Sequence, residues 1–252
     1  MVDIVGSGHI QGPSDGVGQG LYEESSVQLG RVGALRELND GRRFRYAYFA
    51  SATNAGLLVS QDVSATAVVE TDNIATAAAI GATQVILTDS GTLGSATADQ
   101  YAGGYLHTTD DAGEGYTYRI MGNTAASSNA VTFSLYDPLV IALTTASDVA
   151  ITGSLWYNVC AAGYKDSAFT DYIVSGVTNR VMQANYYGWV QTTGVCTILA
   201  DGSIAIGDNL TLSDGVAGAV QLKDAETEPL IGQATFAPDN TGHVGVRLYG
   251  LE

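Results

Sequence analysis

Apolar and polar residues alternate with a period of two along much of the chain, which is the pattern of β-strands. Residues 131–135 alternate strictly, and residues 44, 46 and 48 place three aromatic side chains on one face of a strand. That strand follows the turn residues Asp40 and Gly41, so we expect a hairpin there, with Arg43 and Arg45 on its opposite face. Further strands are expected at residues 84–89, 105–109, 116–120, 149–152 and 155–159.

A denser series of short apolar runs follows, separated by turns at Asp201-Gly202, Asp214-Gly215 and Gly242. This spacing is typical of a small barrel or sandwich. We expect its strands at residues 187–191, 195–199, 208–212, 219–222, 230–236 and 244–248.

Helix is expected in one place only. Asp72 could cap a short helix over residues 74–80 that ends at Gly81. Elsewhere the many Gly, Thr and Val residues suit strands and turns, whereas long helices need Leu, Glu, Lys and Arg, which are scarce here. The prediction is an all-β protein of small barrel or sandwich modules.

Four parts are expected along the chain: an extended arm at 1–28, a β-rich domain at 29–160, a connection at 161–184 and a barrel-like module at 185–252. The arm is rich in Gly, which makes ordering it unfavourable without burial to compensate. Two alternatives stay open for it: a flexible leader, or an arm ordered by a neighbouring subunit.

The balance of charge restricts the partners. The chain has 10 Lys and Arg against 26 Asp and Glu, a net charge of −16, and the cations near residues 31–45 are interleaved with Glu37 and Asp40. Nucleic acid is bound by clustered cations, so we expect no nucleic-acid site. No apolar run is long enough for a spanning helix, and no signal peptide is visible, so we expect a protein made in a cytoplasm without membrane contact.

Candidate chemistry is sparse. Cys160 and Cys196 stand in apolar runs without zinc-site spacing, and His9, His107 and His243 lie in separate regions. The turn from Asp110 to Glu114 is acidic but lacks the order of a calcium loop. We expect no enzyme, no metal and no cofactor.

Three stretches resemble structural proteins of tailed bacteriophages. The features that they share are patterns of Gly and turn residues. The first stretch is Gln28-Leu-Gly-Arg with Asp40-Gly-Arg-Arg-Phe-Arg-Tyr-Ala47, and the second is Tyr101-Ala-Gly-Gly-Tyr-Leu106 with Gly113-Glu-Gly-Tyr-Thr-Tyr-Arg-Ile120 and Leu135-Tyr-Asp-Pro-Leu139. The third is Tyr187-Gly-Trp-Val-Gln-Thr-Thr-Gly194 with Gly207-Asp-Asn-Leu210, Ala217-Gly-Ala-Val220 and Ile231-Gly-Gln-Ala234. The third stretch is also similar to the small barrel of head decoration (cement) proteins.

The resemblance implies a homotrimer on the outer capsid surface of the virion that stabilises contacts between major capsid subunits. The acidity of the chain suits that outer surface. We expect capsid or inter-subunit contacts in the arm and in the hairpin, at Val2, Ile4, Ile10, Leu21, Tyr22, Arg42, Arg43, Phe44, Arg45 and Tyr46. Two alternatives stay open: a tail or head-to-tail component, and a carbohydrate- or host-binding module with exposed Tyr residues and Trp189 as a stacking platform.

Overall fold

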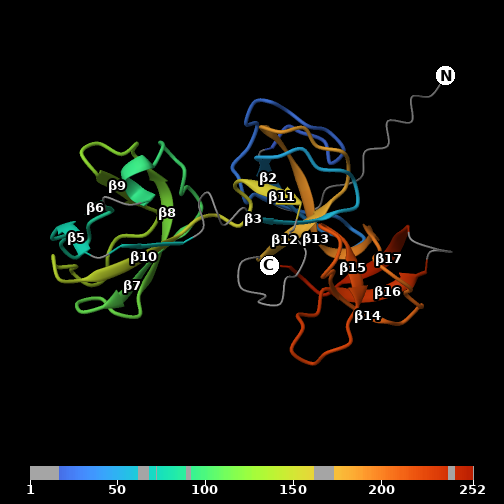
Figure 1. Ribbon diagram of the computed structural model, residues 1–252. Coiled ribbons are helices and arrows are strands. Elements are labelled where there is room, and N and C mark those ends of the chain that lie inside the picture. Colours follow the sequence, from blue (N-terminus) through green and yellow to red (C-terminus); the bar gives the residue numbers. More distant parts are fainter. Residues whose placement is uncertain are drawn as a thin grey trace, which may run out of the picture. The chain divides into compact units, whose positions relative to one another are not determined.

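The computed structural model describes residues 17–61, 68–71, 73–88, 92–161, 173–237 and 242–251. The chain forms two units: unit 1 comprises Met1–Asp62 and Trp156–Glu252, and unit 2 comprises Val63–Leu155 (Figure 1). The described residues contain seventeen strands, one short 3-10 helix and no α-helix, which confirms the all-β prediction. Unit 2 is therefore an insertion within the sequence of unit 1.

Unit 1 is built around one ten-stranded sheet, whose strands come from both sides of the insertion. They are β1 (Leu35–Glu37), β2 (Arg43–Phe49), β3 (Leu58–Gln61), β11 (Val159–Ala161), β12 (Val174–Thr178), β13 (Tyr186–Leu199), β14 (Asn209–Leu212), β15 (Val220–Leu222), β16 (Gly232–Phe236) and β17 (His243–Leu248).

Five of these strands close into a barrel. The order is β2, β11, β3, β12 and β13, and the barrel closes because β13 also pairs with β2, with Trp189 opposite Tyr46. The strands β1 and β2 form the expected hairpin around Gly41. Closure leaves these five strands without a free edge along their paired length.

Strand β13 continues beyond the barrel. Its pairing with β2 shifts register between Gln191 and Thr193, and from Gly194 onward it pairs with β17 instead. The strands β17, β16, β14 and β15 follow in order, and Val220 on β15 returns to bridge Ala200 just after β13. One long strand is thus shared between the barrel and a second, strongly curved sheet.

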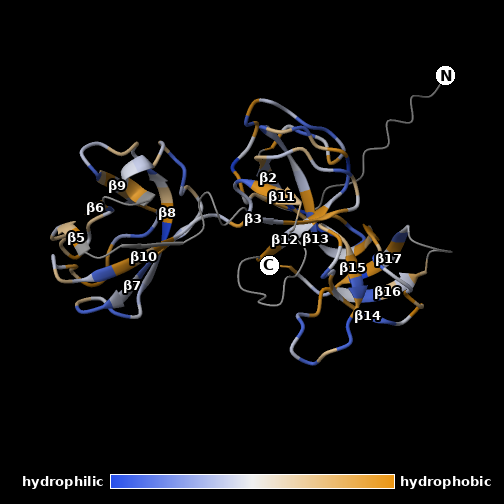
Figure 2. Ribbon diagram, in the orientation of Figure 1, coloured by the Kyte–Doolittle hydropathy of each residue, from blue (hydrophilic) through white to orange (hydrophobic). Residues whose placement is uncertain are grey.

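The apolar core of unit 1 follows this division. Ala47, Phe49 and Val190 pack in one buried cluster of the barrel, while Val220, Val244 and Val246 belong to another in the second sheet. In Figure 2 hydrophobic residues, drawn in orange, gather along β11 and β13. Strand β2 is buried on both faces, since Phe44 and Tyr46 on its other face are also almost inaccessible.

Unit 2 is built on a separate seven-stranded sheet. Its order is β4, β10, β7, β8, β9, β6 and β5, and β4 and β5 at the two ends are separated by a single residue. The N–H of Ile74 on β5 donates to the carbonyl of Ser147 beside β10, at 3.3 Å. The elements are β4 (Val68–Thr71), β5 (Asn73–Thr76), β6 (Gln84–Thr88), η1 (Thr92–Ser95), β7 (Tyr105–Asp110), β8 (Thr117–Asn123), β9 (Ala130–Leu135) and β10 (Asp148–Thr152).

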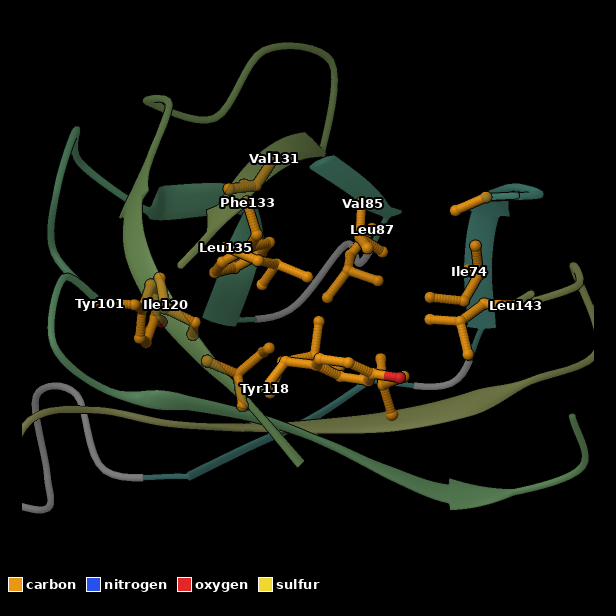
Figure 3. Close-up of a cluster of buried hydrophobic side chains, with 14 of the residues drawn as sticks. Ile74, Val85, Leu87, Tyr101, Tyr118, Ile120, Val131, Phe133, Leu135 and Leu143 are labelled. Carbon is orange, nitrogen blue, oxygen red and sulfur yellow. The ribbon is translucent and has the colours of Figure 1, made fainter. Parts of the chain in front are cut away.

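The interior of unit 2 is a hydrophobic core of its own. Figure 3 shows inward-pointing side chains from β5, β6, β8 and β9 that face one another, among them Ile74, Leu87, Ile120 and Phe133. Each of these four side chains is at most 1% exposed. Alternate residues along β9 are buried, as the strict alternation over residues 131–135 predicted.

Three expectations about elements and boundaries were wrong. The expected helix over 74–80 is the strand β5 with the bridge of Ala78 to Leu143, because Thr and Ile pair there with β6 and leave no helical ladder. The expected connection at 161–184 contains β12, a strand of the barrel. The expected domains at 29–160 and 185–252 also differ from the two units, because β13 pairs with β2 across the insertion.

The arm expected at 1–28 is described from residue 17 onward, and this part lies on unit 1. Val17 and Gln19 are 6% and 2% exposed, and Ser25 forms a β-bridge with Tyr187. For residues 17–25 both alternatives for the arm are therefore wrong, since the segment is ordered by its own chain.

Candidate functional site

A groove of about 570 Å³ lies in unit 1 where β13 passes from the barrel into the second sheet. It is lined by residues from seven parts of unit 1: Tyr22, Arg42, Ala55, Gly56, Val177, Thr178, Asn179, Gln191, Val195, Cys196, Thr197, Thr235, Phe236, His243 and Gly245. The residues 22 and 42 belong to the arm and hairpin that the sequence singled out. The groove is therefore where two of the predicted contact residues come together.

The segment that carries Tyr22 is fixed by hydrogen bonds from the loop after β12. The side-chain amide of Asn179 donates to the carbonyl of Leu21, and Arg180 Nη1 donates to the carbonyl of Tyr22 at 2.8 Å. Arg180 Nη2 also lies 3.1 Å from Glu24 Oε1. These contacts position the Tyr22 side chain, which is 63% exposed, at the groove.

Behind this segment, Gln19 connects three buried side chains, those of Arg36, Tyr46 and Trp189. Its carbonyl accepts from Arg36 Nη1 at 2.8 Å and from Trp189 Nε1 at 3.2 Å, and its side-chain oxygen accepts from the Tyr46 hydroxyl at 2.7 Å. Burial raises the pKa of Tyr46, although its bond to the N–H of Leu29 acts in the opposite direction. The network fastens residues 17–25 to β2 and β13, since buried polar groups are stable only when paired.

Arg42 borders the groove and is paired with Asp40 at 2.7 Å. The backbone and side-chain N–H groups of Arg42 hold the pKa of the Asp40 carboxyl below its usual range. Burial lowers the pKa of Arg42, but Asp40 and Tyr22 outweigh that effect and raise it. The guanidinium is thus a permanent cation beside the Tyr22 ring.

The groove wall includes a thiol, on Cys196, and an imidazole, on His243, which are a potential nucleophile and a potential base. Burial raises the pKa of the Cys196 thiol to about 12, so the thiolate that nucleophilic chemistry requires is scarce at neutral pH. His243 Nε2 lies 3.4 Å from the carbonyl of Ala55, at the limit of hydrogen bonding. This arrangement gives the groove binding surface without an activated nucleophile.

Two large apolar side chains complete the groove rim. Val195 and Phe236 are 55% and 58% exposed, on β13 and β16. The sequence analysis missed both, because their runs alternate like any other strand and their exposure depends on the shift in β13. The outward position of Val195, between Gly194 and Cys196, is not marked by any pattern in the sequence.

Some of the residues predicted to contact the capsid or another subunit lie outside the described ranges, and others are buried in the core. Val2, Ile4 and Ile10 lie outside the described residues. Phe44 and Tyr46 are 1% and 0% exposed and lie within the core of their own chain, so as folded they offer no surface to another subunit. This happens because residues 17–21 cover the face of β2 that the sequence pattern left open.

The remaining predicted residues lie nearer the surface. Leu21 packs against the cluster around Trp189, and Arg43 Nε is 3.4 Å from Glu37 Oε2. Arg45 lies over the Trp156 ring at 4.8 Å and donates to the carbonyl of Gly33. Of the seven predicted residues that the structure describes, Tyr22 and Arg42 are the two that line the groove.

The structure also places the residues considered for sugar stacking and for metal binding. Trp189 is 0% exposed, so as folded it cannot serve as a stacking platform for a sugar. The acidic turn from Asp110 to Glu114 joins β7 to β8, with Asp110 Oδ1 accepting from the N–H of Asp111. Over the ranges that the structure describes, no three His, Cys, Asp or Glu side chains are grouped as metal ligands would be.

The described segments also include no helix with the length and apolar character needed to cross a membrane. No protein-family model, curated protein or solved structure matches this chain.

Proposed function

We propose that this protein is a structural component of a tailed-phage virion, a decoration protein that binds the outer surface of the head as a homotrimer and stabilises contacts between major capsid subunits. The observation that carries the proposal is the groove at the β13 junction. It combines exposed apolar side chains, Tyr22, Val195 and Phe236, with a permanently charged Arg42 and lacks an activated nucleophile.

Burial of such side chains against another subunit is favourable by roughly 25 cal/mol per Å2 of apolar surface. Exposed aromatic rings with a neighbouring Arg are also the residues enriched at protein interfaces. The resemblance of the Gly and turn patterns to decoration proteins supports the head as the location. The acidic composition supports an outer surface, because a genome-facing surface needs clustered cations.

The direct test is the copy number of this chain relative to the major capsid protein in purified particles, measured by quantitative mass spectrometry. A ratio near one to one supports a decoration protein spread over the whole shell. A handful of copies per particle would favour a tail or head-to-tail component instead. Absence from particles would contradict any role in the virion.

A second test concerns the groove itself. Phe236→Ser and Val195→Ser would be added to heads that lack this protein, and retention would be measured by co-sedimentation. We expect weaker retention than for the parent chain, because both substitutions remove apolar surface at the rim. Ile80→Ser is the matched control, since Ile80 is 67% exposed but lies in unit 2.

The predicted contacts in the N-terminal region require a deletion that spares the body of unit 1. Removing all of residues 1–28 would also remove Gln19, whose partners are buried. Deletion of residues 1–16 keeps that network and tests Val2, Ile4 and Ile10 as contacts. Unchanged head occupancy by this variant would rule out a role for residues 1–16 in attachment.

A further inference from the structure

The outer face of unit 2 carries a row of residues that the proposed function does not use. Tyr105 on β7 lies directly opposite Arg119 on β8, and the N–H of Tyr136 bonds to the carbonyl of Arg119 on the other side at 3.0 Å. The three residues therefore stand side by side across neighbouring strands. Tyr105 and Tyr136 are 44% and 37% exposed.

Arg119 is unusual in this row. Residues 63–155 contain nine Asp or Glu residues but only one Lys or Arg, which is Arg119. Within the described part of the chain Arg119 has neither an ion pair nor a hydrogen bond from its side chain, and its Nε is buried without an acceptor. Its Cζ lies 5.2 Å from the centroid of the Tyr136 ring, so the ring holds the guanidinium in place.

The outward neighbours of Arg119 on β7 and β8 are uncharged. His107 follows Tyr105 on the same face, with its ring nitrogens 3.2 Å and 3.0 Å from the hydroxyls of Thr117 and Thr152. Met121 on β8 adds an apolar side chain that is 52% exposed. No carboxylate stands at the outward positions 105 and 107 of β7 or 117, 119 and 121 of β8. A guanidinium with open donors is thus left for a ligand.

We propose that this face of unit 2 binds a saccharide that carries a carboxylate, with Arg119 on the carboxylate and Tyr105 and Tyr136 against sugar rings. Arg presents paired donors that match a carboxylate. Tyr offers an apolar ring and a hydroxyl, as a sugar offers C–H faces and hydroxyls. The two tyrosines lie two strand spacings apart, about 9.6 Å, which two or three linked sugar rings can span.

The negative net charge of unit 2 favours a ligand with few negative charges over a nucleic acid. A nucleic acid presents dense phosphate charge and would meet nine carboxylates with one cation to compensate. A saccharide that carries a single carboxylate brings only one negative charge, which Arg119 can pair. This inference depends on unit 2 alone, so it stands or falls separately from the location on a phage head.

The test is titration of the full chain with defined oligosaccharides of galacturonate, glucuronate and N-acetylneuraminate, and with their carboxyl-reduced forms. We expect at least one acidic oligosaccharide to bind, and its reduced form to bind roughly tenfold more weakly, because a charge-assisted hydrogen bond is lost. Arg119→Gln should weaken binding to the same extent. Tyr105→Ala and Tyr136→Ala should weaken both the acidic and the reduced sugars.

Arg247→Gln is the matched control, because Arg247 is an exposed strand residue of unit 1 and its loss changes the net charge equally. We expect it to bind like the parent chain. No binding by any of the three acidic sugars, or equal binding by Arg119→Gln, would overturn the proposal. Acetate that competes as well as the oligosaccharide would overturn the saccharide part, since a carboxylate alone would then suffice.

Discussion

The guanidinium of Arg36 lies over the indole ring of Trp189, with its Cζ 4.0 Å from the ring centroid. The same guanidinium donates to the carbonyls of Val17 and Gln19, at 2.9 Å and 2.8 Å. Arg36 is 4% exposed, so one buried cation joins the N-terminal segment to β13. The wall of the groove that carries Tyr22 depends on this contact.

Replacement of Arg36 by Met should therefore destabilise unit 1. Met fills part of the volume, but the carbonyls of Val17 and Gln19 each lose the hydrogen bond from Arg36, and we expect a loss of about 3 kcal/mol. Urea unfolding followed by tryptophan fluorescence measures it. Arg247→Met, at an exposed position, should change the free energy of unfolding by less than about 0.5 kcal/mol. Equal effects of the two variants would contradict a structural role for Arg36.

The bend in β13 depends on Gly194. Its φ is +92°, and an added Cβ would lie 2.8 Å from Arg42 Cγ and 3.1 Å from Arg42 Cα. Gly194→Ala combines backbone strain with a steric clash, and we expect it to cost about 2–3 kcal/mol. Gly202→Ala is the control, because Gly202 has a φ of +84° but no atom within 4 Å of the added Cβ.

The comparison between these two glycines separates strain from contact. Gly202→Ala should cost only about 1 kcal/mol, the usual penalty for a left-handed backbone. Thermal unfolding of both variants gives the difference. If Gly202→Ala were as destabilising as Gly194→Ala, the contact between the added Cβ and Arg42 would add no steric cost at position 194.

Alkaline pH should weaken unit 1. Burial raises the pKa of both Tyr46 and Tyr187 above 10.0, so the folded state keeps these protons longer than the unfolded chain does. The unfolded state binds fewer protons above about pH 10, and stability must fall as the pH rises through that range. Denaturant unfolding between pH 8 and pH 11 measures the decline.

A matched pair of variants identifies the tyrosines responsible. Tyr46→Phe should lose about 1 kcal/mol at pH 8, with the bond to Gln19, but should show a shallower decline above pH 10. Tyr249→Phe should leave the decline unchanged, because Tyr249 is 49% exposed. A decline of the same slope in both variants would mean that other groups cause it.

Cys196 should be almost inert toward alkylation in the folded protein. With its pKa raised to about 12 by burial, only a very small fraction is thiolate at pH 8, and the thiolate is the reactive form. Iodoacetamide labelling followed by peptide mass spectrometry should modify Cys196 slowly in buffer and rapidly in urea. Rapid labelling without urea would contradict the burial of this thiol.

The sequence predicted the positions of strands far better than it predicted which strands pair with one another. Alternation places Val131 and Phe133 on one face of β9, because a side-chain period of two depends on the strand alone. The pairing of Trp189 with Tyr46 joins residues more than a hundred positions apart, and no local pattern encodes it. For the same reason the insertion of unit 2 between β3 and β11 and the groove at the β13 bend were not predictable.

The contact residues show the same limit. Tyr22 was predicted at a contact surface and lies exposed at the groove. Phe44 and Tyr46 were predicted there too, from their place on one strand face. They are buried because residues 17–21 cover that face, and a Gly-rich segment gives no sequence pattern that predicts where it will lie.

Excision of unit 2 should leave unit 1 folded. Gln61 at the end of β3 lies opposite Val159 at the start of β11, so the chain leaves and re-enters unit 1 at neighbouring points of one antiparallel pair. A short Gly-Ser linker in place of residues 63–155 can join these strands as a hairpin, because paired residues of neighbouring strands are only about 5 Å apart. The shorter closing loop lowers the entropy of the unfolded chain and partly offsets any lost contacts.

We expect the excised chain to keep a cooperative unfolding transition and the near-ultraviolet circular dichroism of Trp156 and Trp189, both of which belong to unit 1. Residues 63–155 expressed alone should also fold, because their buried cluster, from Ile74 to Ile151, comes entirely from unit 2. Loss of the transition in the excised chain, while residues 63–155 still fold, would mean that unit 1 requires the insertion to hold β3 against β11.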